Sequence, residues 1–281
     1  MRVLITGAAG MLGQDVQRSA TAAGHEPVAL ARAELDITDR AAVQAAVADA
    51  KPHVLINCAA WTDVDGAEAQ EQAATAVNGD GTGNLAQAAA AHGTHMIHIS
   101  SDYVFDGSKH APYVESDPPS PLSAYGRSKL AGEHMVASAA PANHTIVRSS
   151  WLFGAGGRCF PATILQLAAE RDELSIVDDQ RGCPTFTGHL ARALVQLART
   201  RPAGIIHLAG AGYCTWFEFA QRIVQAGGLT CEVKPGRTAE LGRPAPRPQY
   251  SVLGTERAEL PTMPHWREGL SEFMALTVGT R

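Results

Sequence analysis

Short apolar stretches rich in β-branched residues alternate with longer alanine-rich stretches through the first half of the chain. The apolar stretches have the usual length of buried strands in a parallel sheet, and the alanine-rich stretches have the length and spacing of helices. The predicted strands are 3–6, 27–31, 54–57, 96–100 and 145–148. The predicted helices are 12–23, closed by Gly24, then 41–50, 67–92 and one that begins near Ala124.

This alternation predicts βαβ units, and therefore an α/β fold built on a Rossmann-like, doubly wound parallel sheet. From residue 151 onward the pattern is less regular and the loops lengthen. Residues 230–247 hold most of the late proline and glycine, which favours an irregular segment. We therefore expect a sheet domain over 1–150 and a smaller, partly interleaved C-terminal lobe over 151–281. Segments near 186–210 are expected to return to the sheet.

Composition narrows the class of protein. With 281 residues, 45% hydrophobic and 18% charged, the chain can bury a full core and is not expected to be disordered. The net charge of −5 gives no general attraction to nucleic acid or to an anionic membrane. No apolar run reaches the roughly 20 residues that cross a bilayer, and the N-terminus lacks signal-peptide features. Five scattered cysteines without CxxC spacing indicate reduced thiols, so we expect a cytoplasmic protein.

Three glycines follow the first predicted strand and open the first predicted helix. Gly7 allows a tight turn, Gly10 lets the backbone approach a pyrophosphate, and Gly13 lets helix and strand pack closely. The helix N-terminus adds free N–H groups and the positive end of its dipole. A bare turn is the alternative, but the order of strand, glycine loop and helix favours a dinucleotide site.

The end of the second predicted strand bears on the choice between NAD and NADP. A carboxylate there would bind the ribose hydroxyls, whereas an arginine accommodates a 2′-phosphate. Arg32 lies at this end, which favours NADPH over NADH. A solvated surface arginine is the alternative interpretation.

Tyr125 and Lys129 share one face of a predicted helix, at positions i and i+4. A free tyrosine titrates near pH 10. The lysine ammonium, together with the positive ring of an oxidised nicotinamide, would favour the phenolate and lower that pKa. The tyrosine could then exchange a proton with a carbonyl or alcohol oxygen. A surface Tyr–Lys pair is the simpler interpretation of the spacing alone, and the glycine loop favours the catalytic one.

Hydroxyl groups follow the fourth predicted strand, at Ser100 and Ser101. Open α/β sheets bind ligands at the carboxyl ends of their strands. A hydroxyl there can hydrogen-bond a substrate oxygen and stabilise its developing charge, although such residues also cap loops. His98 and His207 lie in predicted strands without an accompanying ligand cluster, so we expect them to be structural and predict no metal site.

These motifs together resemble the extended short-chain dehydrogenase/reductase superfamily and, within it, the dTDP-4-dehydrorhamnose reductase family. The matching segments extend along most of the chain. They are the glycine loop at 7–13, LDITD at 35–39, NCAAWTDVDGAE at 57–68, NGDGTGNL at 78–85, SSDYVFDG at 100–107, YGRSK at 125–129, RSSWLF at 148–153, DQRGCPT at 179–185 and RPQYSVL at 247–253. The last three distinguish this family from the wider superfamily.

The resemblance implies an NAD(P)H-dependent reductase that converts dTDP-4-dehydro-L-rhamnose, a dTDP-linked keto-deoxysugar, to dTDP-L-rhamnose. Ser101, in place of the family's threonine, would join Tyr125 and Lys129 as the catalytic residues. The expected cofactor contacts are Gly7, Gly10, Met11, Leu12, Gly13, Arg32, Asp36, Ile37, Ala59, Ala60, Trp61, Asn78, Tyr125 and Lys129. The expected substrate contacts are Ser101, Asp102, Tyr103, Tyr125, Trp151, Arg181 and Arg247.

Two of these residues have specific implied roles. Trp151 would pack against the sugar ring, and Arg247 would bind the nucleotide phosphates. The resemblance also makes 1–150 the cofactor domain and 151–281 mainly the substrate lobe. Some family members form a magnesium-bridged dimer, which extends the expectation to a homodimer and to Mg²⁺, although the sequence offers no evident ligand set.

The chain departs from the family pattern at Cys58, Trp61 and Gly66, where the family usually has alanine, a smaller ring and lysine. These changes are expected to affect which sugar is bound more than which reaction is catalysed. One alternative is therefore a reductase of another dTDP-4-keto-6-deoxy sugar, such as a streptose-like or antibiotic sugar. Another is a non-catalytic regulatory subunit resembling methionine adenosyltransferase beta, against which the retained Ser–Tyr–Lys set argues.

Overall fold

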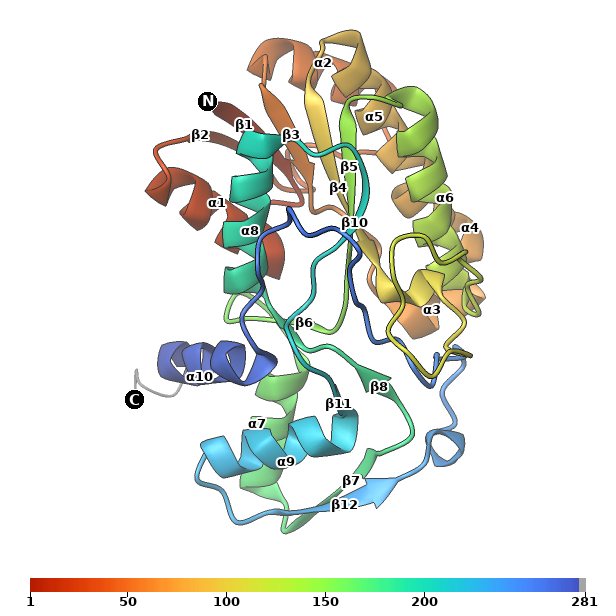
Figure 1. Cartoon of the computed structure of the whole chain (residues 1–281), viewed down its shortest axis with the longest axis vertical. Helices are drawn as coiled ribbons and strands as arrows, with labels where there is room; N and C mark the ends of the chain where they lie inside the picture. Colours follow the sequence, from red (N-terminus) through yellow and green to blue (C-terminus); the bar gives the residue numbers. More distant parts are fainter. Residues whose placement is uncertain (278–281) are drawn as a thin grey trace.

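A six-stranded sheet forms the centre of the computed structural model, which describes residues 1–277 (Figure 1). All its neighbouring strands run parallel. Across the sheet the strands are β10 (Gly204–His207), β5 (His144–Ser149), β4 (His95–Ser101), β3 (Val54–Asn57), β1 (Arg2–Thr6) and β2 (Glu26–Leu30). The winding reverses at β1, because β2 lies on one side of it and β3 on the other. Such a reversal leaves a crevice at the carboxyl ends of the strands.

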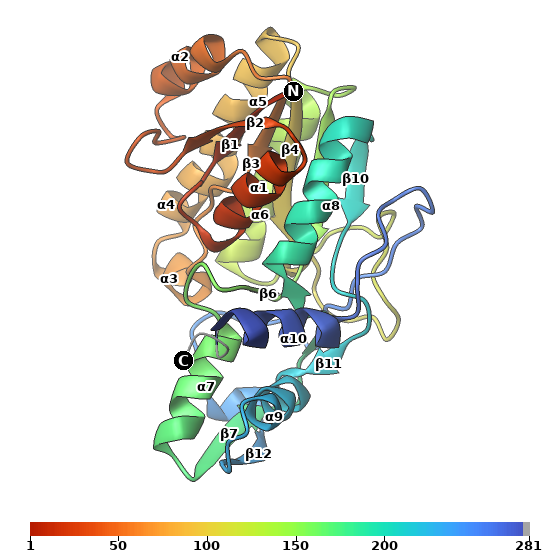
Figure 2. The same ribbon diagram turned by 90° about the vertical axis from the view of Figure 1, so that its left-hand side faces the viewer.

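Helices cover both faces of the sheet (Figures 1 and 2). One face carries α1 (Met11–Ala22) and α8 (Thr187–Thr200), and the other carries α2 (Arg40–Ala50), α5 (Thr82–Ala91) and α6 (Ala124–Ala139). Each face has its own buried apolar cluster, one including Val16 and Leu194 and the other Val43 and Leu85. The predicted α/β, doubly wound parallel sheet is confirmed.

The helix that carries the Tyr–Lys pair begins where the sequence predicts. The Ser123 side chain accepts a hydrogen bond from the Gly126 N–H at 3.1 Å and caps α6. Serine is a preferred N-cap because its hydroxyl pairs one of the free N–H groups of the first turn. This cap fixes the start of α6, and with it the positions of Tyr125 and Lys129 above the sheet.

The single helix predicted over 67–92 is wrong. The segment forms α3 (Val64–Ala69), α4 (Glu71–Thr75), the π-helical turn η1 (Ala76–Gly81) and α5. Gln70 leaves helical geometry at φ −137° and separates α3 from α4. In η1 the Asn78 amide is fully buried and bonds to Trp61 and Ser128. A Cβ on Gly132 of α6 would lie 2.2 Å from the Asn78 carbonyl oxygen. Tertiary contacts therefore override the helical pattern.

The C-terminal lobe lies beyond the carboxyl ends of the strands (Figures 1 and 2). Its elements are β6 (Leu152–Phe153), α7 (Phe160–Glu170), β7 (Glu173–Val177), β8 (Arg181–Gly182), β9 (Thr185–Phe186), β11 (Cys214–Thr215), α9 (Trp216–Ala226), β12 (Glu232–Gly236), η3 (Thr238–Glu240) and α10 (Trp266–Thr277). Its core is aromatic, with Phe153, Phe219 and Phe273 packed edge to face. The segment 230–247, expected to be irregular, contains β12, because β12 pairs with β7 along its whole length.

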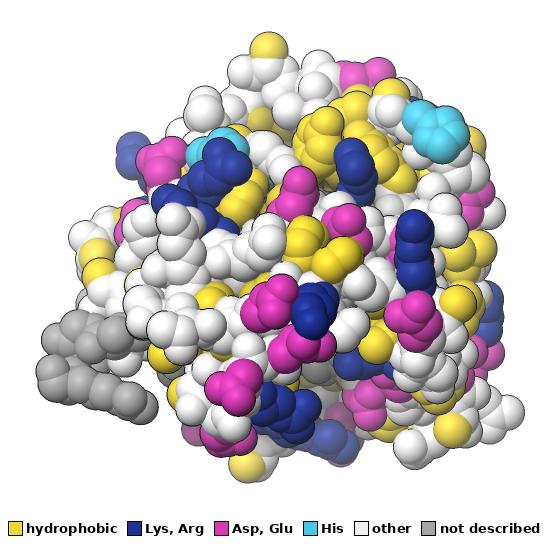
Figure 3. Space-filling model, turned by 90° about the horizontal axis from the view of Figure 1, so that it is seen from below, with side chains coloured by type: hydrophobic (Ala, Val, Ile, Leu, Met, Phe, Trp, Pro, Cys, Tyr) yellow, Lys and Arg dark blue, Asp and Glu magenta, His cyan; other side chains and the backbone are white. Residues whose placement is uncertain are grey.

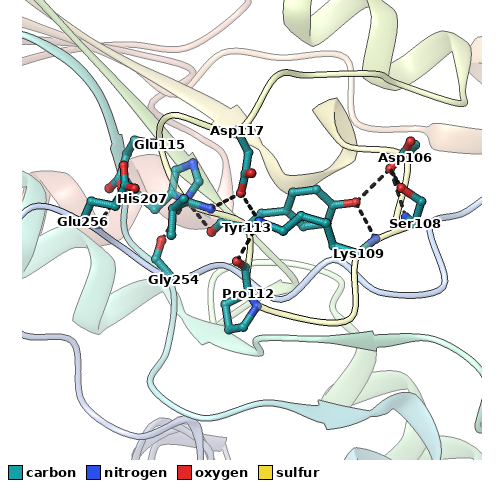
Figure 4. Close-up of polar contacts among 11 residues, drawn as sticks. Asp106, Ser108, Lys109, Pro112, Tyr113, Glu115, Asp117, His207, Gly254 and Glu256 are labelled. Atoms are coloured by element: carbon teal, nitrogen blue, oxygen red, sulfur yellow. Dashed lines mark hydrogen bonds and ion pairs between the residues drawn. The ribbon is translucent and has the colours of Figure 1, made fainter.

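The loop between β4 and α6 folds back against the last strand of the sheet (Figure 4). The Tyr113 hydroxyl donates to the Asp106 carboxylate at 2.8 Å. The His207 backbone N–H donates to Glu115 at 2.9 Å, and its Nδ1 donates to the carbonyl oxygens of Tyr113 and Gly254 at 3.1 and 2.9 Å. His207 is thus a structural histidine, as predicted, and it anchors the loop that leads into α6.

The lower face of the lobe carries acidic and basic side chains interspersed with apolar ones (Figure 3). Ion pairs between β7 and β12, such as Lys234 with Glu173, belong to this lobe. Among residues 1–277, no helix combines the length and the apolar character that a membrane span requires.

Candidate active site

The glycine loop joins β1 to α1 at the carboxyl edge of the sheet. Gly7 has a φ of +66°, and a Cβ there would lie 2.5 Å from the Ala59 backbone nitrogen. A Cβ on Gly13 would lie 2.4 Å from the Gly7 carbonyl oxygen. Gly10 is exposed and begins α1 without a side-chain cap. The loop therefore packs closely against backbone atoms at Gly7 and Gly13, and no side chain caps the helix N-terminus at Gly10. This arrangement suits a phosphate group.

Met11 and Leu12 form the first turn of α1, where backbone N–H groups lack a partner within the helix. The Leu12 side chain is buried in the core beneath the sheet, and Met11 packs against the apolar cluster of the C-terminal lobe. What these two residues can offer to a phosphate is the backbone N–H, since both side chains are used in packing.

Arg32, Asp36 and Ile37 follow β2, but only the first two face outward. Arg32 and Asp36 are exposed, whereas Ile37 is buried among the helices of its face. The Thr38 backbone N–H and hydroxyl hydrogen-bond the Asp36 carboxylate and hold its pKa below the usual value, with a smaller effect from the Arg32 charge. The carboxylate is engaged within its own loop, and the Arg32 side chain is exposed beside it.

The loop after β3 is held in place by η1. Ala59 and Ala60 are half-buried in this loop, beside the glycine turn. The Asn78 side chain accepts from the Trp61 N–H at 2.9 Å and donates to the Trp61 carbonyl oxygen at 3.1 Å and to Ser128 Oγ at 2.9 Å. Because both amide N–H groups and the amide oxygen are bonded within the protein, Asn78 holds the loop after β3 in place.

Ser101, Tyr125 and Lys129 come together at the carboxyl end of β4. Ser101 ends the strand, and its side chain lies within hydrogen-bonding reach of the Tyr125 hydroxyl. Lys129 is one turn further along α6, and its Nζ donates to the Ile99 carbonyl oxygen at 2.7 Å. The three residues that the sequence predicts as catalytic are therefore neighbours, although they come from two elements.

Removal from water dominates the protonation of this group. Burial raises the pKa of Tyr125 to about 12, partly opposed by the hydrogen bond from Ser101. Burial lowers the pKa of Lys129 to about 8, opposed by the charge of Glu133. The sequence suggested that the lysine, with an oxidised nicotinamide, lowers the tyrosine pKa. In the structure the ammonium is turned toward Ile99, so burial sets the direction for Tyr125.

A buried ion pair beneath these residues was not predicted. Glu133, one turn beyond Lys129 on α6, accepts two hydrogen bonds from Arg148, at 2.9 and 2.7 Å. Glu133 also accepts a hydrogen bond from the Ser100 hydroxyl at 2.5 Å. The Ser100 hydroxyl therefore points toward the buried ion pair and away from Ser101. Arg148 in turn lies over the Phe105 ring. No local spacing connects Glu133 on α6 with Arg148 on β5, so the sequence offers no signal for this pair.

Asp102 and Tyr103 follow Ser101 in the short 3₁₀ turn η2 (Asp102–Val104). The Asp102 carboxyl is 2% exposed and accepts hydrogen bonds from the hydroxyls of Ser101 and Ser251. The Tyr103 ring meets the Tyr125 ring edge to face, at 5.7 Å between centroids. Of the two predicted substrate contacts, Tyr103 is half-exposed beside Tyr125, whereas Asp102 faces the protein interior.

Trp151 adopts a left-handed backbone conformation, with φ +48°. Its indole stacks on Trp216 at 3.5 Å between centroids and 6° between planes. A Cβ on Gly182 would lie 2.4 Å from the same indole, so the ring lies between Trp216 and the Gly182 backbone. Trp216 is a site neighbour that sequence reasoning missed, because no local spacing connects it to Trp151.

Arg247 is paired with a carboxylate of the other lobe. Its guanidinium makes two hydrogen bonds to Asp65 of α3, at 3.0 and 2.9 Å, and these hold the pKa of Asp65 below its usual value. Arg243 approaches the same carboxylate at 3.3 Å but is more exposed. Arg181 is exposed in β8, and its backbone pairs with the segment 249–251 that follows Arg247.

The described part of the chain contains no cluster of metal-binding side chains. Within residues 1–277, no three His, Cys, Asp or Glu side chains gather where they could hold an ion. The five cysteines are free thiols. The Mg²⁺ that the family resemblance suggested therefore has no support in this region.

Comparison with known proteins identifies related sequences over nearly the whole chain. The family described as RmlD substrate binding domain matches residues 1–278. A dTDP-4-dehydrorhamnose reductase of Streptomyces griseus is 45% identical over 98% of this chain and 94% of its own. A probable dTDP-4,6-dihydroxy-2-methyloxan-3-one 4-ketoreductase of Streptomyces antibioticus is 41% identical over 97% and 94%.

A solved structure is also similar to this chain over nearly its whole length. The dTDP-4-dehydrorhamnose reductase of Bacillus anthracis, in complex with NADP, superposes with a TM-score of 0.95 at 38% identity. The match covers 98% of this chain and 99% of that one. Fold and sequence thus point to the same group of proteins.

Proposed function

Because the chain belongs to the family described as RmlD substrate binding domain, we propose that it is an NADPH-dependent reductase that converts dTDP-4-dehydro-L-rhamnose to dTDP-L-rhamnose. The names of its relatives support the reaction class and the dTDP-linked keto sugar. The Ser–Tyr–Lys group at the carboxyl edge of the sheet supports a reaction that adds a proton to a carbonyl oxygen.

The glycine loop is the part that we assign to the cofactor. Its positive φ at Gly7 and its bare helix N-terminus at Gly10 form a cradle that side chains would fill, which fits a pyrophosphate. The reduced nicotinamide, when bound, supplies the hydride for the keto carbon. The loop with Ala59, Ala60 and Trp61 would form the facing wall.

Tyr125 is the proton donor in this proposal. Its raised pKa of about 12 keeps the phenol protonated at neutral pH, so it has a proton to give to the keto oxygen. The Ser101 hydroxyl would hydrogen-bond the same oxygen as charge develops on it. Lys129, with a pKa of about 8, is mostly charged at pH 7 and would stabilise the phenolate that is left if its ammonium turned from the Ile99 carbonyl toward Tyr125. One hydride and one proton together turn the ketone into the alcohol.

NADPH is the preferred cofactor in this proposal. Arg32 is exposed at the end of β2, where a 2′-phosphate would lie. The nearby Asp36 carboxylate, which could otherwise bind ribose hydroxyls, is held by Thr38. The NADP complex of the Bacillus anthracis relative agrees with this choice.

We assign the cofactor to 1–150 and mainly substrate binding to the region 151–281, with 278–281 outside the described residues. Trp151 lies between Trp216 and the Gly182 backbone, so it would contact the sugar through the edge of its indole. Arg247 begins the late RPQYSVL segment and the Arg181 backbone pairs with it, and guanidinium groups bind phosphates in a bidentate manner. To bind the diphosphate, Arg247 would have to release the Asp65 carboxylate.

The observation that carries the proposal is the placement of the Tyr125 hydroxyl beside Ser101, with the Lys129 ammonium buried one turn away. The test is oxidation of NADPH and, in parallel, of NADH by the purified protein with dTDP-4-dehydro-L-rhamnose. We expect turnover that favours NADPH and that falls by on the order of 10²-fold or more in Tyr125→Phe. An Arg32→Gln variant should lose the preference for NADPH while keeping turnover with NADH.

A reductase of another dTDP-4-keto-6-deoxy sugar is the second candidate. It is favoured by Trp61 and Cys58, which differ from the family pattern beside the site, and by the Streptomyces antibioticus relative. A panel of dTDP-keto sugars separates the two, because the pocket and not the Ser–Tyr–Lys group would differ. Turnover by the protein alone would exclude the regulatory-subunit alternative.

A further inference from the structure

Asp102 is a buried carboxyl without a basic ion-pair partner among the described residues. It is 2% exposed, and its hydrogen bonds come from hydroxyls and backbone N–H groups. Burial raises its pKa to about 7. A carboxyl in such surroundings holds its proton well above the usual range. The group next to the catalytic serine is therefore protonated in part of the molecules at neutral pH.

A chain of hydrogen bonds runs through this carboxyl from the C-terminal lobe to Ser101. Ser251 Oγ donates to Asp102 Oδ2 at 2.5 Å, and Ser101 Oγ donates to Asp102 Oδ1 at 3.0 Å. Ser101 Oγ also accepts from the Tyr103 N–H at 3.1 Å. Ser251 is fixed by its backbone N–H, which donates to the Arg181 carbonyl oxygen at 2.8 Å. The catalytic serine and the substrate lobe thus meet at one carboxyl.

The Ser101 hydroxyl has a single hydrogen, and its direction decides whether Ser101 can donate a hydrogen bond to a substrate. A serine hydroxyl has one hydrogen and two lone pairs. When Asp102 is ionised, that hydrogen goes to the carboxylate, and a keto oxygen, which only accepts, finds no donor on Ser101 and has the Tyr125 hydroxyl alone. When Asp102 is protonated, it can donate to Ser101 Oγ beside the Tyr103 N–H. Both lone pairs are then used, and the single hydrogen points outward to the keto oxygen.

We propose that Asp102 is a positioning residue that sets the donor direction of the Ser101 hydroxyl, and that Ser251 holds the carboxyl in place. The proposal rests on the reductase function proposed above. Asp102 does not touch the substrate and keeps its proton throughout. The proton delivered to the keto oxygen comes from Tyr125.

The ionisable groups that face Asp102 come from three elements. They are Tyr103 beside it, Tyr125 on α6 and Cys183 after β8. Burial raises the pKa of each, to about 12 for Tyr125 and Cys183, so all three stay neutral between pH 5 and 9. Asp102 and Lys129 both titrate in this range, so the Asp102→Asn variant decides which of them causes a change in activity near neutral pH.

The test compares Asp102→Asn with the unaltered protein in kcat/KM for the nucleotide sugar from pH 5 to 9. An asparagine amide donates to Ser101 and accepts from Ser251, as the protonated carboxyl does. We expect kcat/KM of the unaltered protein to fall about tenfold per pH unit above pH 7. The Asn variant should stay level through that window. A fall with the same midpoint in Asp102→Asn, or a folded but inactive Asn variant, overturns the proposal.

A matched pair of serine variants tests the second contact. The Ser251 hydrogen bond lowers the pKa of Asp102, so Ser251→Ala should move the midpoint to higher pH. Ser108 makes a similar contact to Asp106 at 2.9 Å, but on the surface, so Ser108→Ala should leave the midpoint unchanged. Equal midpoints in both variants would remove Ser251 from the proposal.

A measurement without turnover separates this proposal from the proposed function. The pKa of Asp102 is higher in the folded protein than its unfolded value of 3.8. The folded state therefore binds more protons between pH 4 and 7, and its free energy of unfolding should fall with pH relative to Asp102→Asn. If the keto sugar is never reduced, the proposed function is wrong. The stability comparison still shows whether Asp102 is protonated in the folded protein. Parallel curves for the two proteins would refute its protonation.

Discussion

Tyr125 and Lys129 have opposite pKa shifts with one cause, removal from water. Burial disfavours the phenolate and the ammonium alike, which raises the first pKa to about 12 and lowers the second to about 8. The tyrosine is therefore a stable proton donor at neutral pH. The lysine is charged below pH 8 at an energetic cost to the fold, offset in part by the buried carboxylate of Glu133.

That cost is measurable in Lys129→Met. A folded pKa of about 8 against 10.5 unfolded penalises the charged lysine by about 3 kcal/mol below pH 8. The folded state binds fewer protons between pH 8 and 10.5, so the stability of the unaltered protein should rise with pH across this window. We expect the stability difference from the variant, followed by urea unfolding, to change by about 3 kcal/mol there. A constant difference would show that the lysine is not desolvated.

Gly7 illustrates a backbone requirement at a single residue. Its φ of +66° and the 2.5 Å approach of Ala59 act independently. Gly93 has almost the same φ, +65°, with nothing within 4 Å of a Cβ. We expect Gly93→Ala to cost about 1 to 2 kcal/mol from the conformation alone, and Gly7→Ala about 2 to 5 kcal/mol with loss of NADPH binding. Equal losses of stability would show that the close contact with Ala59 is unimportant.

At the scale of elements, the segment from β3 to α5 joins the two lobes. Its loop carries Trp61, held by Asn78 of η1, and its short helix α3 carries Asp65, paired with Arg247. Arg247 and Asp65 are 182 residues apart in sequence. This segment therefore contacts both the cofactor loop and the substrate lobe.

Arg247 and Arg243 form a matched pair for testing phosphate binding. Arg247 makes two hydrogen bonds to Asp65 and is mostly buried, whereas Arg243 makes one at 3.3 Å and is largely exposed. We expect Arg247→Gln to raise KM for the nucleotide sugar about 10- to 100-fold with little change in kcat, since charge-assisted bonds contribute about 1.5 to 3 kcal/mol. Arg243→Gln should change KM less than threefold by the same steady-state assay. Similar effects of both variants would contradict the assignment.

Elements with local signals were predictable, and those set by distant contacts were not. The strand at 54–57 and the start of α6 follow from apolar runs and a serine cap, which are read within a few residues. The break at Gln70 and the turn η1 depend on Asn78 bonding to Trp61 and on close packing against α6. No helical periodicity carries that information.

At the scale of the whole molecule, the C-terminal lobe lies beyond the carboxyl ends of the sheet strands (Figure 2). The glycine loop follows β1 and Ser101 ends β4 at these same strand ends, where Tyr125 and Lys129 of α6 meet Ser101. The motifs predicted the glycine loop and the Ser–Tyr–Lys group, because each lies within seven residues of chain or follows a strand end. The contact of Asp102 with Ser251 spans 149 residues and could not be found from spacing. The homodimer that the resemblance implies stays a prediction, which light scattering tests.

Transfer of a labelled hydride tests the proposed reaction most directly. The purified protein would be incubated with dTDP-4-dehydro-L-rhamnose and NADPH deuterated at the transferring position, and the product examined by NMR. We expect dTDP-L-rhamnose with deuterium at the sugar C4, formed more slowly, by on the order of 10²-fold or more, in Tyr125→Phe under the same conditions. A folded protein that binds NADPH yet leaves the keto sugar unlabelled and unreduced would contradict the reductase assignment.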